Sequence, residues 1–351
     1  MMASDVLTSA ERNASPGLWM LAWRRLCRDR VGLVSCVVVL IFFALMAGSR
    51  VGFIAADWSQ EAGVNYAPPA FIGPEATMAP EPAASVANDS TPRTAQFSST
   101  IVDPLARELA EIAKEIAAVA PEPPKASVLP LGGDKWGRDV LKKVIKGSET
   151  SILVGLVAAA LAAFIGTLFG ALAGYHGGRT DDFFNWFYSV FTSIPYLLLI
   201  LAIAAVLNQK GTLTVILILG LTGWTGIFRL VRAEYLKHKA REYVRAADAI
   251  GASHMRRMFM HILPNVSHVV LVQLSLHVVL FIKSEVVLSF LGFGVGVETV
   301  SWGSMLNEAQ NELILGKWWQ LAAATAAMAI FVTAISLFTD ALRDALDPKL
   351  K

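Results

Sequence analysis

The chain has 351 residues, and its composition is that of a membrane protein rather than of a soluble domain. Hydrophobic residues make up 55% of it and charged residues 17%, and its mean hydropathy is +0.53. The net charge of +2 gives no case for nucleic-acid binding, and the two cysteines, Cys27 and Cys36, suggest neither a disulfide framework nor a metal site.

The first membrane span is expected at residues 31–49, close to the ~20 residues that a bilayer core needs. Residues 1–30 form a cytoplasmic N-terminus, and residues 18–30 have the pattern of an amphipathic helix lying on the inner leaflet. Because about thirty residues precede the apolar run, an uncleaved anchor is favoured over a signal peptide.

Residues 50–148 are expected to form an extracytoplasmic insertion between the first two spans. Its middle is rich in Pro, Ala, Ser and Thr, which favours an irregular surface segment, and residues 103–119 predict an amphipathic helix. Near its end, residues 132–134 predict a turn, and residues 140–145 predict a short helix on the outer membrane face with snorkelling lysines. A passive spacer and an adaptor for a binding protein both fit this composition.

Five further spans are expected at residues 151–175, 183–208, 212–236, 265–288 and 318–337. Gly166 and Gly170 give the second span a spacing that lets helix backbones approach closely in lipid. Pro195 predicts a kink in the third span. The expected fold is therefore all-α and polytopic, with six transmembrane helices, a core at residues 149–340 and a cytoplasmic tail at residues 341–351.

The distribution of basic residues predicts the orientation. With the N-terminus inside, the inner segments hold most of the Lys and Arg, while the short outer loops hold little beyond Lys210 and Lys317. Six spans then place both termini and the segment 241–264 in the cytoplasm.

The segment 241–264 is a polar, basic island between two long apolar runs. At helical period one face collects small and apolar residues, namely Tyr243, Ala246, Ala247 and Ile250. Gly251 then breaks the pattern, and Pro264 stands where the next apolar run begins, at a place where a helix can restart. Such a segment has too many charges to cross a bilayer but can present a small-residue face to another protein. On these residues alone, it could also be only the basic loop that the positive-inside rule requires.

The order of these residues resembles a known family. EYVRAADAIGAS followed by HILPN is similar to the cytoplasmic coupling loop, the EAA loop, of ATP-binding-cassette (ABC) importer permeases, in particular the C-type permease of the oligopeptide, dipeptide and nickel importers. SIPYLLLILA and the closing FTDALRDALDPKLK are similar to the same family, and the resemblance covers roughly residues 129–348. The chain departs from the family pattern at Leu129, Gly133, Arg245 and Thr339.

The resemblance implies a type I ABC importer (MetI-like) permease fold in a bacterial inner membrane, and a subunit without catalytic residues. It implies as partners a second homologous permease, two cytoplasmic ATPase subunits that hold ATP and Mg, and an extracytoplasmic solute-binding protein. The family carries peptides, nickel chelates and other solutes, among which the sequence does not choose. The ATPase-coupling residues that the resemblance implies are Glu242, Tyr243, Arg245, Ala246, Ala247, Gly251, Ala252, Met255, Leu263 and Pro264.

Motifs for chemistry are absent from the sequence: it contains no G-x-x-x-x-G-K-[ST] nucleotide loop, no catalytic constellation and no metal spacing. Lys283 and Glu285 lie near the outer end of the fifth span, and ionisable residues at membrane depth generally face the bundle interior or water. Being two residues apart, they point to different sides of the helix. They are candidates for the pathway or a gate, with snorkelling to the outer surface as the alternative.

Two other classes stay open. A secondary transporter would use an ion gradient without ATPase partners, although the chain shows no inverted repeat and few acidic residues in its spans. A membrane scaffold would act through the insertion. Purification with ATPase subunits separates an ABC permease from both.

Overall fold

The computed structural model is dominated by α-helices, and it describes residues 25–73, 125–296 and 298–346. The helix predicted at residues 103–119 and most of the interfacial helix predicted at residues 18–30 lie outside the described residues. The chain divides into two compact units, Gln60–Asp139 and the remainder.

Helix α3 (Arg30–Val51) is the predicted first span, which is thereby confirmed as a long apolar helix. It begins where the Asp29 carboxylate accepts the N–H of Val31 at 3.0 Å, and it ends at Gly52, whose φ of 85° is left-handed. Its neighbours are α14 (Trp319–Leu346) and α5 (Val140–His176).

Helix α5 runs for 37 residues without a break, so the separate short helix predicted at residues 140–145 is wrong. Those residues are the first turns of the span itself. The snorkelling predicted for its lysines is also wrong for Lys143, whose side chain is 1% exposed and whose Nζ lies 2.7 Å from Glu308 Oε2. The reason is that an acid on α13 (Trp302–Ile314) faces it, in a helix that the sequence did not reveal.

The predicted close approach at Gly166 and Gly170 is confirmed, and Gly174 extends it. All three face α9 (Thr225–Lys239), the helix with which α5 makes its most extensive contact. A Cβ atom at these three positions would lie 2.7, 2.9 and 2.6 Å from carbonyl oxygens of the α9 segment and its cap. The backbones of α5 and α9 therefore lie in close contact, because glycine has no side chain to separate them.

The predicted kink at Pro195 is confirmed as a break between α6 (Gly178–Thr192) and α7 (Tyr196–Leu207), which are bent by 81°. A bidentate ion pair joins α6 to α9, with Arg232 Nε and Nη2 lying 2.5 and 2.6 Å from the two Asp181 oxygens. Aromatic side chains add to the contact of α6 with α5 and α9, namely Phe169, Phe184, Phe187, Phe191, Trp224 and Phe228.

The fourth predicted span consists of α8 (Thr212–Thr222) and α9, with a short break at Gly223 and Trp224. In the described part of the chain, five helices are long and apolar enough to cross a membrane, or up to six if α6 and α7 form one bent span. This agrees with the all-α polytopic fold that the sequence predicts.

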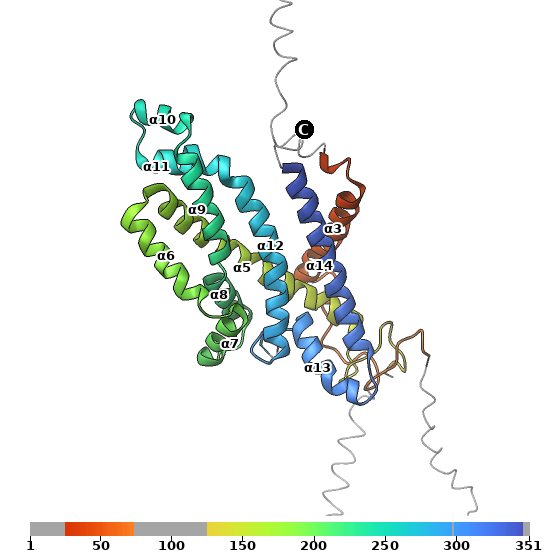
Figure 1. Cartoon of the computed structure of the whole chain (residues 1–351). Helices are drawn as coiled ribbons and strands as arrows, with labels where there is room; N and C mark the ends of the chain where they lie inside the picture. The colour runs from red at the N-terminus through yellow and green to blue at the C-terminus, as the bar shows by residue number, and fades with distance from the viewer. Residues whose placement is uncertain (1–24, 74–124, 297, 347–351) are drawn as a thin grey trace, which may run out of the picture. The chain divides into compact units, whose positions relative to one another are not determined.

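Helix α12 (Leu263–Phe290) links the two ends of the bundle (Figure 1). We call the end that carries α10 (Glu242–Ala249) the α10 end, and the end that carries α13 the α13 end. Helix α13 packs on α12 and α14, and it was missed from the sequence. Its start is fixed by a capping box in which Ser301 and Ser304 exchange hydrogen bonds.

The unit Gln60–Asp139 is held by isolated bridges between its two described stretches, Gly63 with Ala126 and Pro69 with Leu129. The turn predicted at residues 132–134 is wrong in position: turns lie on either side of it, at residues 130–131 and 135–136, and Gly133 forms an isolated bridge with Asp139. The Asp134 carboxylate accepts the backbone N–H groups of Trp136 and Arg138.

Candidate coupling site

Helix α10 ends in a Schellman turn at Gly251. The N–H of Gly251 donates to the Asp248 carbonyl at 2.9 Å, and that of Ala252 donates to the Ala247 carbonyl at 3.0 Å. Gly251 has a φ of 79°, and a Cβ atom there would meet nothing within 4 Å. Glycine is therefore favoured at this position by the left-handed backbone conformation and not by the close approach of a neighbouring atom. The turn leaves Ile250 beside it 84% exposed.

A second helical stretch follows, formed by α11 (His254–Arg256) and the π-helical turn η1 (Arg257–Ile262). Ser253 caps it by accepting the N–H of Arg256 at 3.4 Å. Helix α12 then begins at Leu263 with Pro264 in its first turn, as predicted. The π-turn joins α11 to α12 as one continuous helical path, which the sequence did not show. This turn provides room for Pro264, which has no backbone N–H to donate.

Polar contacts tie this segment to itself and to α5. Arg257 forms an ion pair with Asp248 of α10, and its guanidinium lies 3.0 Å from His254 Nδ1. The Tyr175 hydroxyl, near the end of α5, lies 3.0 Å from the same nitrogen, and Lys239 stacks over the Tyr175 ring at 5.6 Å. The segment 241–264 is thus a folded element attached to two spans.

A further contact joins α9 to α10. The Tyr243 hydroxyl lies 2.9 Å from His238 Nδ1. Desolvation raises the pKa of the Tyr243 phenol, so the hydroxyl stays neutral and keeps its hydrogen-bonding role.

The structure places the predicted coupling residues on different sides of the segment. Ala247 is buried together with Val244 against the chain, whereas Ala252 and Leu263 are half-buried. The residues that are exposed are Glu242, Tyr243, Arg245, Ala246, Gly251, Met255 and Pro264.

Two exposed apolar side chains here were not among the predicted coupling residues. Ile250 is 84% exposed and Met260 is 68% exposed, while the predicted Met255 is 61% exposed. The signal that could have found them is a large apolar residue within a run too charged to enter the bilayer.

Lys283 and Glu285 lie on different sides of α12, as their spacing predicts: Lys283 is exposed and Glu285 is fully buried. Both Glu285 oxygens accept hydrogen bonds, from Ser151 Oγ of α5 and from Ser289 Oγ, each at 2.7 Å.

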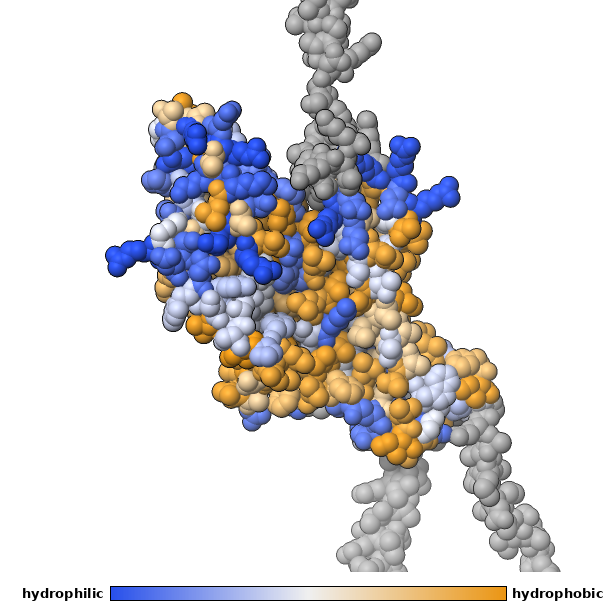
Figure 2. Space-filling view, viewed as in Figure 1, coloured by the Kyte–Doolittle hydropathy of each residue, from blue (hydrophilic) through white to orange (hydrophobic). Residues whose placement is uncertain are grey.

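These features define a class of protein: a polytopic helical membrane protein that carries a folded, charged segment at the α10 end of its spans. Figure 2 shows hydrophilic side chains gathered over α10 and α11 and an apolar surface over the spans. Within the described ranges, no three His, Cys, Asp or Glu side chains are grouped to hold a metal ion.

The chain belongs to the family of binding-protein-dependent transport system inner membrane components, whose pattern matches residues 166–351. Residues 17–69 match the N-terminal transmembrane domain of oligopeptide transport permease C. The resemblance to C-type ABC importer permeases is therefore confirmed, and the protein is a membrane-spanning permease subunit.

Relatives agree with this assignment. The chain is 38% identical to the dipeptide transport system permease protein DppC of Bacillus subtilis, over 63% of this chain and 68% of that protein. It is 29% identical to DppC of Lactococcus lactis, over 99% of this chain and 96% of that protein. A solved structure of the MetNI methionine ABC transporter is 16% identical, with a TM-score of 0.48, and covers 58% of this chain and 96% of its own; the assignment does not depend on it.

Proposed function

We propose that the protein is the permease subunit of an ATP-driven importer for peptides or peptide-like solutes, and that residues 241–264 dock on an ATPase subunit. The supporting observation is the folded segment at the α10 end, which exposes Ile250 and Met255 among charged side chains. The names of the relatives support a peptide cargo, because they describe dipeptide and oligopeptide transport.

In this proposal, ATP binding closes a pair of cytoplasmic ATPase subunits and displaces the docked segment. The contacts of Arg257 with Asp248 and of His254 with Tyr175 keep that segment rigid, so the displacement passes to α5 and α12. Access then alternates across the membrane as a two-state equilibrium biased by nucleotide.

The proposal places the α10 end and both termini in the cytoplasm of a bacterial cell, and the insertion 50–148 outside it. The basic residues at the α10 end support this orientation. A second homologous permease would complete the membrane part, and an extracytoplasmic solute-binding protein would deliver the cargo.

The family assignment favours this function over a secondary transporter or a scaffold. The test is affinity purification of tagged protein in a mild detergent. ATPase subunits and a second permease are expected in the purified complex. A lone chain, in a detergent that preserves a known ABC importer, would contradict the proposal.

Substitutions at Gly251 separate backbone strain from added bulk. Gly251→Asn is expected to retain ATPase binding, because asparagine tolerates the left-handed conformation. Gly251→Ala adds backbone strain of roughly 1–2 kcal/mol, and its methyl group would meet no atom within 4 Å. Gly251→Trp adds bulk on the docking surface and is expected to uncouple ATP hydrolysis from uptake while insertion in the membrane is kept. Equal coupling in all three variants, measured as peptide uptake per ATP hydrolysed, would contradict docking at this turn.

Lys283 is proposed to face the cargo pathway. It lies seven residues, or about 10 Å, from the end of α12. No hydrogen bond or ion pair engages it within the residues that the structure describes, and a charge facing lipid at this depth is unfavourable. Lys283→Gln is expected to lower uptake of a free-acid tripeptide about fivefold and to leave uptake of the tripeptide amide unchanged, because only the free acid has a carboxylate to pair. Lys210→Gln, in the loop between α7 and α8, is the control; equal losses for both peptides would refute the pairing.

A further inference from the structure

Glu285 is a fully buried acid in the last two turns of α12, and about 30 Å of helix separates it from Pro264 at the end of the coupling segment. Its burial and its contacts distinguish it from Lys283, because no part of it reaches a surface of the chain. A buried carboxylate is retained at such a place only where its hydrogen bonds are satisfied.

Two serine hydroxyls donate hydrogen bonds to the Glu285 carboxylate and link it to backbone N–H groups; we call these two links the serine relays. Ser151 Oγ donates to one carboxylate oxygen and accepts the backbone N–H of Trp302 at 3.2 Å. Ser289 Oγ donates to the other oxygen and accepts the backbone N–H of Val295 at 3.4 Å. Each hydroxyl therefore has one defined donor role and one defined acceptor role. The carboxylate of Glu285 thereby fixes the backbone before and at the start of α13.

Close backbone packing accompanies these relays. A Cβ atom at Gly303 would lie 2.6 Å from Ser289 Cβ and 2.8 Å from Val286 Cα, so the first turn of α13 lies directly on α12. A Cβ atom at Gly147 would lie 3.2 Å from the Trp302 nitrogen, so α5 approaches the same turn from another direction. Three helices meet at this point with little room to slide.

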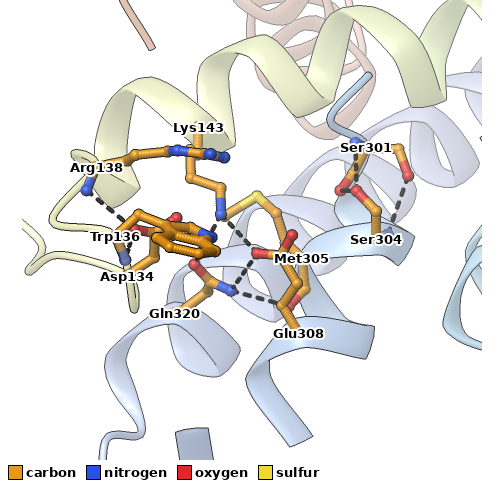
Figure 3. A network of polar contacts seen from close by, with 9 residues as sticks. All are labelled: Asp134, Trp136, Arg138, Lys143, Ser301, Ser304, Met305, Glu308 and Gln320. Carbon is orange, nitrogen blue, oxygen red and sulfur yellow. Dashed lines mark hydrogen bonds and ion pairs between the residues drawn. The ribbon is translucent and has the colours of Figure 1, made fainter. Parts of the chain in front are cut away.

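A second set of contacts braces α13 further along (Figure 3). Lys143 Nζ of α5 lies 2.7 Å from Glu308 Oε2 and 3.2 Å from Gln320 Oε1 of α14. Gln320 in turn donates to the Met305 carbonyl at 3.2 Å. The indole N–H of Trp302 donates to the Val144 carbonyl of α5 at 3.2 Å. Helix α13 is thus fastened to α5 at its start and at its middle.

Two of the helices that hold α13, namely α5 and α12, also reach the α10 end. Helix α12 continues the helical path that begins at His254, and the Tyr175 hydroxyl of α5 contacts His254 itself. Helices α5 and α12 are therefore attached to the coupling segment at the α10 end. At the α13 end they are attached to each other through Ser151 and Glu285.

We propose that Glu285 is a positioning residue for transport: its two serine relays make α5, α12 and α13 move as one body, so that displacement of the coupling segment reaches α13. The inference rests on the proposed coupling function of residues 241–264. It assigns Glu285 a role in transmitting movement between the α10 end and the α13 end, and not in contacting the cargo.

The test uses the complex purified with its ATPase subunits and reconstituted in lipid nanodiscs. Hydrogen exchange is followed by mass spectrometry with and without ATP and vanadate, which requires no knowledge of the cargo. In the natural sequence, nucleotide trapping is expected to change exchange both in residues 241–262 and at the amides of Val295 and Trp302. In Glu285→Gln the first response is expected to persist and the second to be lost, because the amide nitrogen that replaces one carboxylate oxygen donates and cannot accept, so the serine that faces it loses its acceptor.

Ser151→Ala and Ser289→Ala each remove one relay and keep the test valid where Glu285→Gln does not fold. Each is expected to speed exchange of its own amide, Trp302 or Val295, about tenfold, the effect of losing one buried hydrogen bond. Ser284→Ala is the matched control, since Ser284 is buried next to Glu285 and its hydroxyl donates within α12, to the Leu280 carbonyl. Unfolding temperatures are measured for all variants to separate transmission from stability.

Persistence of the nucleotide response at Val295 and Trp302 in Glu285→Gln would overturn the inference. The same loss in Ser284→Ala would also overturn it, by showing a general packing effect. If residues 241–262 show no nucleotide response in the natural sequence, the proposed coupling site fails, and the inference fails with it.

Discussion

Replacing Gly170 by leucine is expected to prevent the protein from reaching a folded, monodisperse state in detergent. Replacing it by alanine is expected to lower the free energy of unfolding by about 1–3 kcal/mol, the usual effect of overpacking. A Cβ atom at Gly170 would lie 2.9 Å from both the Phe228 carbonyl oxygen and Val231 Cβ of α9. Neither atom can rotate away, so the helices themselves must separate.

Gly226→Ala is the control for this prediction. A Cβ atom at Gly226 would meet only His277, at 3.5 Å, which is ordinary contact. Both glycines lie within helices, so the helix preference of alanine, worth about 1 kcal/mol, acts in both variants. Thermal unfolding followed by tryptophan fluorescence should therefore show a lower midpoint for Gly170→Ala than for Gly226→Ala. Equal midpoints would mean that the two backbones are not in close contact.

The same pair of helices shows what a sequence can and cannot predict here. The spacing of Gly166 and Gly170 predicts a helix face made for close approach, and the structure confirms it. The spacing does not name the neighbour, because any helix with a compatible surface could fill that face. That the neighbour is α9, with carbonyls of Trp224, Phe228 and Arg232 opposite successive glycines, follows only from the three-dimensional packing.

At the α13 end, sequence reasoning failed for a related reason. Lys143 was expected to snorkel because it lies next to apolar residues near a membrane surface. Its actual partner, Glu308, lies in α13, a short amphipathic helix that was not recognised between two spans. A Ser cap at Ser301 followed by apolar residues at helical spacing was the available signal. The burial of Glu285 was likewise out of reach, because its partner Ser151 lies in α5, far away along the chain.

The coupling segment was better predicted, because its signals are local. Its helical pattern, the break at Gly251 and the first turn of α12 at Pro264 all appear in the structure. Which apolar residues face outward was not local information: Ala247 turns inward because Val244 beside it packs against the chain. The docking roles of the individual residues stay predictions.

Ile250→Asp is expected to weaken attachment of the ATPase subunits by about thirtyfold or more, the loss of 2 kcal/mol or more that is typical of a buried interface anchor. Ile250 is 84% exposed in this chain, at the Schellman turn that projects from α10. A large apolar side chain among charged residues, outside the membrane spans, is well suited to fill a pocket on a partner protein. A carboxylate at this position would be buried without a partner and would oppose docking.

Ile314→Asp is the matched control. Ile314 is 83% exposed, nearly the same as Ile250, but it ends α13 at the opposite end of α12. The measurement is the amount of ATPase subunit retained with each tagged variant during purification in detergent, together with the ATP hydrolysis of the recovered complex. The proposed docking site requires loss in Ile250→Asp and retention in Ile314→Asp. Loss in both would indicate a general effect of added charge, and retention in both would mean that the ATPase subunits bind elsewhere than at the α10 turn.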